Sequence, residues 1–357
     1  MRRRNIFGQR VRGQAVVFVG LALVVLVALT GLAVDGANAF NQRRNATNGA
    51  DAAAVAGTRA ITVQKKAGGG DSSAVFSEIE SYLVKHHLDD ALGLEWSAYY
   101  VDRHATRLTS DAEVTNTSAD VPSGAYGVEV ELRYRFATFF MSILGQPDLT
   151  VSGKASAIYG PASTVVGGDL IPLAVSQQAA QQSQDGQNVC IFGSDDEENP
   201  CGDSGAYQIT PGNFGQVAFD PAGTNAPGDG SSCEAEDSED SLGYWWCQGS
   251  QYPIYLGMQL SGDPGMLSNS LAEEIDWRID NRRQGLVPVF GYVNDENGNN
   301  TTFTIVGFMA IELVSYDVTA PADERWVLAK KIGYYTTAGS IGGGAVDTGV
   351  YAINLVR

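Results

Sequence analysis

The sequence predicts an α+β protein with one long N-terminal transmembrane helix, a small helix-plus-sheet region, and a mainly β extracytoplasmic domain that contains disulfides. Three observations predict this class. Residues 15–34 carry no charge and number twenty, enough to cross the ~30 Å hydrocarbon core of a bilayer. Residues 127–136 alternate apolar and charged side chains, which is typical of a half-buried strand. All four cysteines lie in the second half of the 357-residue chain.

The apolar run is interpreted as an uncleaved membrane anchor. Five arginines lie in residues 1–13, so the positive-inside rule keeps this basic leader in the cytoplasm and exports the chain after Asp35. The alternative is a cleavable signal peptide, for which Ala37-Asn38-Ala39 would serve as the cleavage site. A run of twenty exceeds the usual ~7–15 apolar residues of a signal peptide, which favours the anchor.

Residues 14–66 contain no proline and are expected to form one continuous helix, membrane-spanning at first and then membrane-proximal. Three glycines at 68–70 end it. Within the region 67–160, Asp71 or Ser72 can cap a second helix. Strands are then expected at 127–136 and 149–160, joined by a short apolar piece that forms a helical turn or an edge.

Residues 161–357 are expected to form the mainly β domain. Turn-forming residues at 294–300 join two strands in a hairpin, and apolar residues at every fourth position predict a helix within 266–284. Residues 176–250 are expected to be long loops held by two disulfides. Three pairings are possible; short loops close at the least entropic cost, which favours the local ones. These pair Cys190 with Cys201 and Cys233 with Cys247.

The composition argues against nucleic-acid binding and catalysis. The net charge is -18, and residues 161–270 contain fifteen acidic residues and no Lys or Arg, whereas phosphate affinity needs basic side chains. Residues 202–205 read Gly-Asp-Ser-Gly, as around a serine nucleophile, but the three histidines lie far away at 86, 87 and 104. We therefore expect no enzyme.

No cofactor is expected, although calcium remains an alternative. His86 and Asp90 share a helix face but lack a third metal ligand. Acidic clusters at 194–199 and 234–240, and the hairpin tip, offer oxygen ligands without the EF-hand spacing. Solvated polar loops are the favoured interpretation. Trp245 and Trp246 are interpreted as core residues beside Cys247, with an exposed binding patch as the alternative.

The first sixty residues resemble the TadE/TadG-like family of bacterial tight-adherence (Flp-type) pilus proteins. The resemblance rests on four parts in order, which are Gly13-Gln14, Asp35-Gly36, Arg43-Arg44, and the run from Asn48 to Gly57 that includes Asp51. It implies a pilin-like character for the region 67–160. It also implies a membrane-anchored, exported component of a pilus or its assembly machinery. Its partners would be the lipid bilayer and other pilin-like or assembly proteins of the membrane.

One departure from the family bears on the leader. Type IV pilin-like members carry Glu at the fifth position after the leader cleavage site, and the corresponding residue after Gly13 is Phe18. The alternative function is a membrane-tethered, adhesin-like module whose C-terminal half binds a surface, with or without calcium.

Small residues in the membrane-proximal helix are the candidate functional surface. They form two neighbouring ladders at four-residue spacing, which are Gly49, Ala53 and Gly57, and Ala46, Ala50 and Ala54. Small side chains let helix backbones approach closely, so these ladders are expected to pack against helices of partner proteins. The alternative is an Ala-rich helix covered by the chain's own small sheet, because Ala is also the best helix former.

Overall fold

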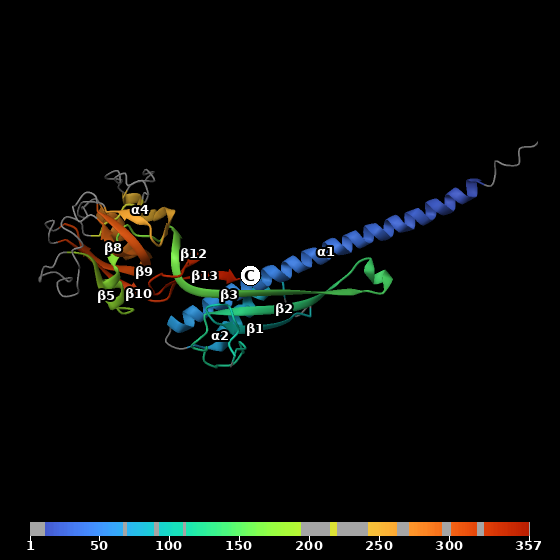
Figure 1. Ribbon diagram of the computed structural model, residues 1–357, viewed down its shortest axis with the longest axis horizontal. Helices are drawn as coiled ribbons and strands as arrows, with labels where there is room; N and C mark the ends of the chain where they lie inside the picture. The colour runs from blue at the N-terminus through green and yellow to red at the C-terminus, as the bar shows by residue number, and fades with distance from the viewer. Residues whose placement is uncertain are drawn as a thin grey trace, which may run out of the picture. The chain divides into compact units, whose positions relative to one another are not determined.

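The computed structural model describes residues 11–66, 70–88, 93–109, 112–193, 215–219, 242–262, 271–294, 301–319 and 325–356. The chain forms two compact units, which Figure 1 shows in ribbon form. The first unit comprises Met1–Gly57, Asp71–Ala157 and Leu355–Arg357. The second comprises Thr58–Gly70 and Ile158–Asn354.

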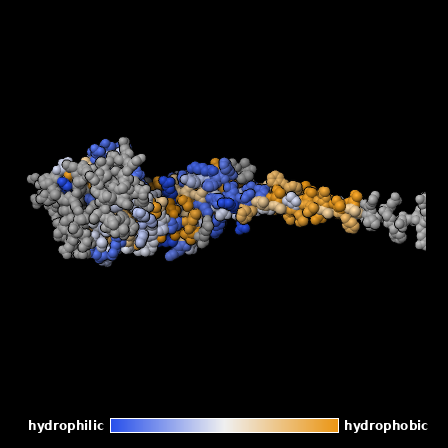
Figure 2. Space-filling model, turned by 90° about the horizontal axis from the view of Figure 1, so that it is seen from above, coloured by the Kyte–Doolittle hydropathy of each residue, from blue (hydrophilic) through white to orange (hydrophobic). Residues whose placement is uncertain are grey.

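Helix α1, Val11–Lys66, is continuous over 56 residues, which confirms the single helix expected from the lack of proline. It is long and apolar enough to cross a membrane, and is therefore compatible with an anchor. The side chains of its apolar run are exposed, as at Phe18, which is 71% exposed. Figure 2 shows this part of the helix as a continuous apolar surface.

The rest of the first unit is a helix and a small antiparallel sheet. Helix α2, Ser72–Lys85, begins as predicted, because the Asp71 carboxylate accepts a hydrogen bond from the Ser73 backbone N–H at 2.9 Å. Strand β1, Glu95–Val101, pairs with β2, Gly127–Ala137, and β2 neighbours β3, Asp148–Gly167. Between β2 and β3, a single 3₁₀ turn, η2, covers Met141–Leu144.

Strand β2 has the predicted alternation, with one correction. Its apolar side chains are buried as expected; they are Val128, Val130, Leu132, Tyr134 and Phe136. Glu129 was expected on the solvated face, yet it is only 6% exposed. The difference arises because Glu129 accepts hydrogen bonds from Arg107 and Ser156, and Lys154 lies 3.1 Å away. A buried carboxylate is tolerated where such partners compensate for lost water.

The second unit is mainly β, as predicted. Its six-stranded sheet has the order β4-β8-β9-β10-β5, with β7 paired to β9. The strands are β4 Val175–Ser176, β5 Asn188–Gly193, β6 Ser250–Tyr255, β7 Gln259–Ser261, β8 Gln284–Asn294, β9 Thr302–Asp317, β10 Trp326–Ile332, β11 Tyr335–Thr337, β12 Gly339–Ile341 and β13 Val350–Val356. The second half of β3 pairs with β6 and β12.

The long antiparallel pair β8 and β9 is the hairpin that the sequence predicts, with Gln284 opposite Glu312 and Asn294 opposite Thr302. Three short helices accompany the sheets, and they are α3 Gln177–Gln182, α4 Leu242–Gln248 and α5 Ala272–Asp280. Helix α5 falls within the predicted range 266–284. Apolar side chains from these elements, such as Phe308 and Ile275, form the cores of this unit.

The predicted disulfides lie partly outside the described residues. Cys190 and Cys247 are buried at 3% exposure, and neither is a free thiol. Cys201 and Cys233 are not among the described residues. The local pairing therefore stays a prediction.

Candidate functional site

The motif residue Asp35 connects α1 to a segment more than a hundred residues further along the chain. Its carboxylate accepts three backbone N–H hydrogen bonds, from Phe139 at 2.8 Å, Phe140 at 2.9 Å and Met141 at 2.6 Å. The side chain has no exposed surface. Asp35 thus fixes the connection between β2 and β3 to the point where the apolar run of α1 ends.

The connection offers these three donors because of its own short-range structure. Thr138 closes its base by donating from its backbone N–H to Pro147 O at 2.8 Å and from Oγ1 to Gln146 O at 2.6 Å. The first N–H groups of a helical turn have no acceptor within the turn. Asp35 supplies that acceptor for η2 from another element.

The electrostatics of Asp35 favour the charged form. Burial alone would raise the pKa of its carboxyl group, but the hydrogen bonds from Phe139, Met141 and Phe140 lower it by more. The resulting pKa lies below the ordinary value of 3.8. Asp35 is therefore a carboxylate at neutral pH, held by backbone donors.

Two glycines of α1 flank this carboxylate in different environments. A Cβ added at Gly31 would lie 2.5 Å from Cγ of Phe140, so the ring covers the helix backbone at that position. Gly36 has no heavy atom within 4 Å of an added Cβ and is exposed. Of the motif pair Asp35-Gly36, the aspartate therefore makes the tertiary contact.

The small-residue ladders are covered by the chain's own first unit. Each of the six residues is buried, and they are Ala46, Gly49, Ala50, Ala53, Ala54 and Gly57. An added Cβ at Gly49 would meet Cδ1 of Leu88, and one at Gly57 would lie 2.8 Å from Cγ1 of Ile79. At Gly153 of β3, it would meet the carbonyl of Ala46. These contacts correspond to the alternative interpretation, in which the chain covers its own helix.

The remaining motif residues have less defined surroundings. Gly13 and Gln14 lie within α1, and their surroundings are outside the described set. Asp51 is half-buried and has an interaction partner. Arg43 is exposed and borders an open cavity of about 740 Å³ on the sheet of the first unit.

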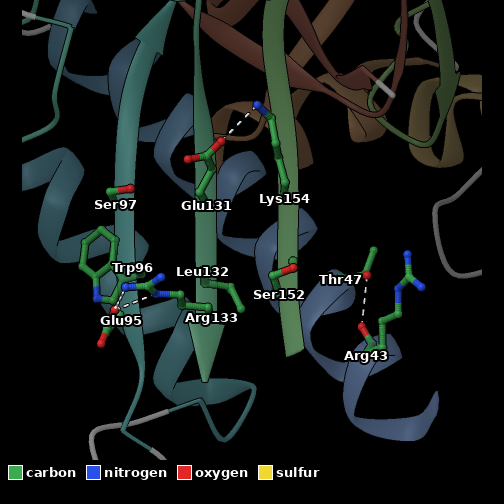
Figure 3. A pocket seen from close by; sticks show the side chains of 11 residues that line it. Arg43, Thr47, Glu95, Trp96, Ser97, Glu131, Leu132, Arg133, Ser152 and Lys154 are labelled. Atoms are coloured by element: carbon green, nitrogen blue, oxygen red, sulfur yellow. Dashed lines mark hydrogen bonds and ion pairs between the residues drawn. The ribbon is translucent and has the colours of Figure 1, made fainter. Parts of the chain in front are cut away.

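That cavity is lined mainly by charged and polar side chains, as Figure 3 shows. The charges on its strands are paired with each other, since Arg133 lies 2.5 Å from Glu95 and Lys154 lies 3.0 Å from Glu131. Ser97 and Ser152 also face this side of the sheet. Paired charges on neighbouring strands stabilise a sheet surface.

Other candidates from the sequence divide into two groups. Trp245 and Trp246 are 3% and 0% exposed, so the core interpretation is confirmed and the exposed patch is wrong. Asp90, Ser204, the acidic clusters at 194–199 and 234–240, and residues 295–300 of the hairpin tip lie outside the described residues. Within the described part of the chain, no group of three His, Cys, Asp or Glu side chains could hold a metal ion.

The fold and site define a class of protein in which one long apolar helix continues into an α+β unit, and a buried helix carboxylate fixes the first hairpin of that unit. Comparison with known families makes this class specific. Residues 13–60 match the family described as putative Flp pilus-assembly TadE/G-like, which confirms the resemblance for this segment. No curated protein and no solved structure matches the chain significantly.

The matched segment contains Asp35 and both small-residue ladders, whereas the hairpin that Asp35 binds lies outside it. Sequence reasoning recognised Asp35 as a motif residue but missed its partner. A signal was present in the apolar piece at 137–145, for which a helical turn was one of the two expected structures, because such a turn has free N–H groups that need an acceptor.

Proposed function

We propose that the chain is a structural, non-catalytic component of a bacterial Flp/Tad-type pilus or of its assembly machinery. The observation that carries the proposal is the match of residues 13–60 to the pilus-assembly family, on the same helix that is long and apolar enough to cross a membrane. In this proposal α1 anchors the protein, and the parts of the two units that follow Asp35 work outside the cytoplasm.

The distribution of charge supports this orientation. Five arginines lie in residues 1–13 before the apolar run, whereas Asp35 follows it directly and only two arginines, Arg43 and Arg44, follow within the next ten residues. Basic residues flanking a transmembrane helix remain on the cytoplasmic side. The α+β units would then lie where pilus subunits assemble.

The packing of α1 after its apolar run supports a structural role. Its small residues bring α2 and the sheet directly onto the helix, as at Gly57 against Ile79 and Val128. The helix and the first unit thus form one packed body rather than a tether with a separate head. A body of this kind can transmit position from the membrane to the exported region.

Deletion of the gene in the bacterium that encodes it tests the proposal. We expect loss of pili in electron micrographs and loss of surface adhesion, both restored by the full chain. A matched control replaces residues 1–34 with a cleavable signal peptide, which exports the chain without an anchor and should not restore pili. Normal piliation in the deletion strain would contradict the proposal.

If the deletion strain lacks pili, pili purified from the wild-type strain show whether the chain is in the filament or stays in the membrane.

A further inference from the structure

The tip of the β2–β3 hairpin, residues 137–147, is apolar and exposed. It contains no charged side chain. Its large apolar side chains are exposed to different degrees, and they are Phe139 at 65%, Phe140 at 39%, Ile143 at 81% and Leu144 at 79%. Contiguous exposed apolar side chains of this size mark an interaction surface on a protein.

This tip lies at the level where the apolar run of α1 ends. Phe140 covers Gly31, which precedes the end of the run at Val34 by ~4.5 Å at 1.5 Å per residue. The carboxylate of Asp35 binds the tip backbone one residue after that end. In Figure 1 the short green turn between β2 and β3 is this tip, and the blue helix is α1.

The apolar surface of the tip continues the apolar surface of α1. On the helix, Leu29 and Leu32 are 59% and 55% exposed, and the tip adds Ile143 and Leu144 at the same end. Asp35, the carboxylate that directly follows the apolar run, is covered by the tip and satisfied by three backbone donors. The surroundings of the apolar run of α1 therefore also contact the apolar tip beside it.

We propose that the tip of the β2–β3 hairpin enters the lipid bilayer beside α1 and forms a second membrane contact. The occupant of this surface is the boundary between lipid headgroups and acyl chains, where exposed Phe, Ile and Leu side chains gain from burial. This inference rests on the proposed function, because it assumes that α1 crosses a bilayer. A second contact beside the helix would fix the rotation and tilt of the first unit against the membrane, which a single helix leaves free.

Photo-crosslinking tests this contact on the full chain. The photoreactive residue p-benzoylphenylalanine replaces Leu144 in the protein reconstituted into vesicles of phosphatidylethanolamine and phosphatidylglycerol. After irradiation, mass spectrometry identifies the adducts. Leu29 serves as the positive control because it lies within the apolar run of α1.

Val84 of α2 serves as the negative control, since it is apolar and 54% exposed but lies far from the membrane. The end of α2 approaches Gly49, fifteen residues beyond Val34 on α1, which corresponds to ~22 Å along the helix. We expect lipid adducts at 144 as abundant as those at 29, and none above background at 84.

The outcomes separate this inference from the proposed function. Lipid adducts at 29 without adducts at 144, or crosslinks from 144 to a second copy of the chain, overturn the inference while the anchor stands. Absence of lipid adducts at 29 overturns the anchor itself. As a further readout, Asp35→Asn should reduce the lipid adduct at 144 and leave that at 29 unchanged, because it loosens only the tip.

Discussion

Asp35 shows how one side chain can decide where an element lies. A carboxylate without partners would be costly in a position that excludes water, and this one is completely buried. Three backbone donors from 139–141 compensate for the lost hydration. The charge therefore favours the docked position of the hairpin tip, in which the buried carboxylate and the three N–H groups satisfy each other.

Asp35→Asn is expected to release the tip. An amide oxygen is a weaker acceptor than a carboxylate, and its NH₂ group offers a further donor where only acceptors are needed. The measurement is hydrogen exchange of the full chain in nanodiscs, in which the amides of 139–141 should exchange faster than in the wild-type protein. The amides of α2 should be unchanged. Equal protection of 139–141 in both proteins would contradict the role given to Asp35.

The same contact predicts a pH dependence. Because the pKa of Asp35 is lower in the folded protein than its ordinary value of 3.8, its charge stabilises docking fully above that value. This contribution is lost as the pH falls through the lower folded-state pKa. Protection of 139–141, corrected for intrinsic exchange, should stay constant from pH 8 to pH 5 and fall only in strong acid. In Asp35→Asn this acid-dependent fall should be absent.

Glycines where helix and sheet meet should differ in their tolerance of a methyl group. In Gly153→Ala the new Cβ meets the backbone carbonyl of Ala46, which cannot turn aside, and we expect a destabilisation of about 1–3 kcal/mol. In Gly49→Ala it meets the flexible end of Leu88, and the cost should be smaller. Gly36→Ala is the control, because nothing lies near it. Thermal unfolding of the three variants in nanodiscs gives the order, and equal melting temperatures would contradict it.

At the scale of elements, patterns that repeat along the chain were predictive. The lack of proline in 14–66 predicted α1, and the capping residue Asp71 with a helical stripe predicted α2. The period of two in 127–136 predicted β2 and its buried face. Local sequence determines these features, because helices and strands bury the residues that recur with their own period.

The candidate site was less predictable because its contacts join distant parts of the chain. The ladders at 46–57 have the same spacing whether they face a partner's helix or the chain's own sheet, so spacing alone left both interpretations open. Tertiary structure shows Leu88, Ile79 and Val128 on that face. Similarly, Glu129 has the period of a solvated residue, and its burial depends on Arg107, more than twenty residues earlier.

Strand β2 offers a test of this buried charge. Burial would raise the pKa of Glu129, but hydrogen bonds from Arg107, Lys154 and Ser156 lower it by more, to below its usual value of 4.5. Glu129→Gln removes the charge and is expected to destabilise the first unit by about 1.5–3 kcal/mol at pH 7. Because the folded-state pKa is the lower one, the difference from wild type should shrink as the pH falls below ~4.5.

The matched control for this variant is Glu95→Gln on the neighbouring strand. The pair of Glu95 and Arg133 is about two-thirds exposed, and exposed pairs contribute about 0–1 kcal/mol. Chemical denaturation of both variants at pH 7 and pH 3 measures the effect. A loss of stability for Glu129→Gln that is as small as that for Glu95→Gln would show that its burial has no energetic role.

At the scale of the whole molecule, the two units share their chain in an interleaved way. The chain passes between them four times, after Gly57, Gly70, Ala157 and Asn354. Helix α1 therefore contributes most of its length to the first unit and its last residues to the second. In the second unit, Lys65 of this helix donates a hydrogen bond to the Tyr159 hydroxyl at 2.8 Å. Cleavage of the chain near residue 160 would therefore separate the second unit from residues 58–70, which belong to it.

This division of α1 predicts that replacing a buried isoleucine by alanine destabilises the unit to which that isoleucine belongs. Ile61 and Ile79 are both fully buried, but Ile61 belongs to the second unit and Ile79 to the first. Truncation of either to Ala leaves a cavity that costs about 2–5 kcal/mol. Ile61→Ala should therefore increase hydrogen exchange around Tyr159 of β3, which the end of α1 contacts through Lys65, whereas Ile79→Ala should increase it in β1 and β2. If Ile61→Ala loosened β1 and β2 instead, the end of α1 would belong to the first unit.

A fragment of residues 161–357 lacks residues 58–70 of the second unit. In this fragment β8 and β9 should therefore unfold at a lower denaturant concentration than they do in the full chain.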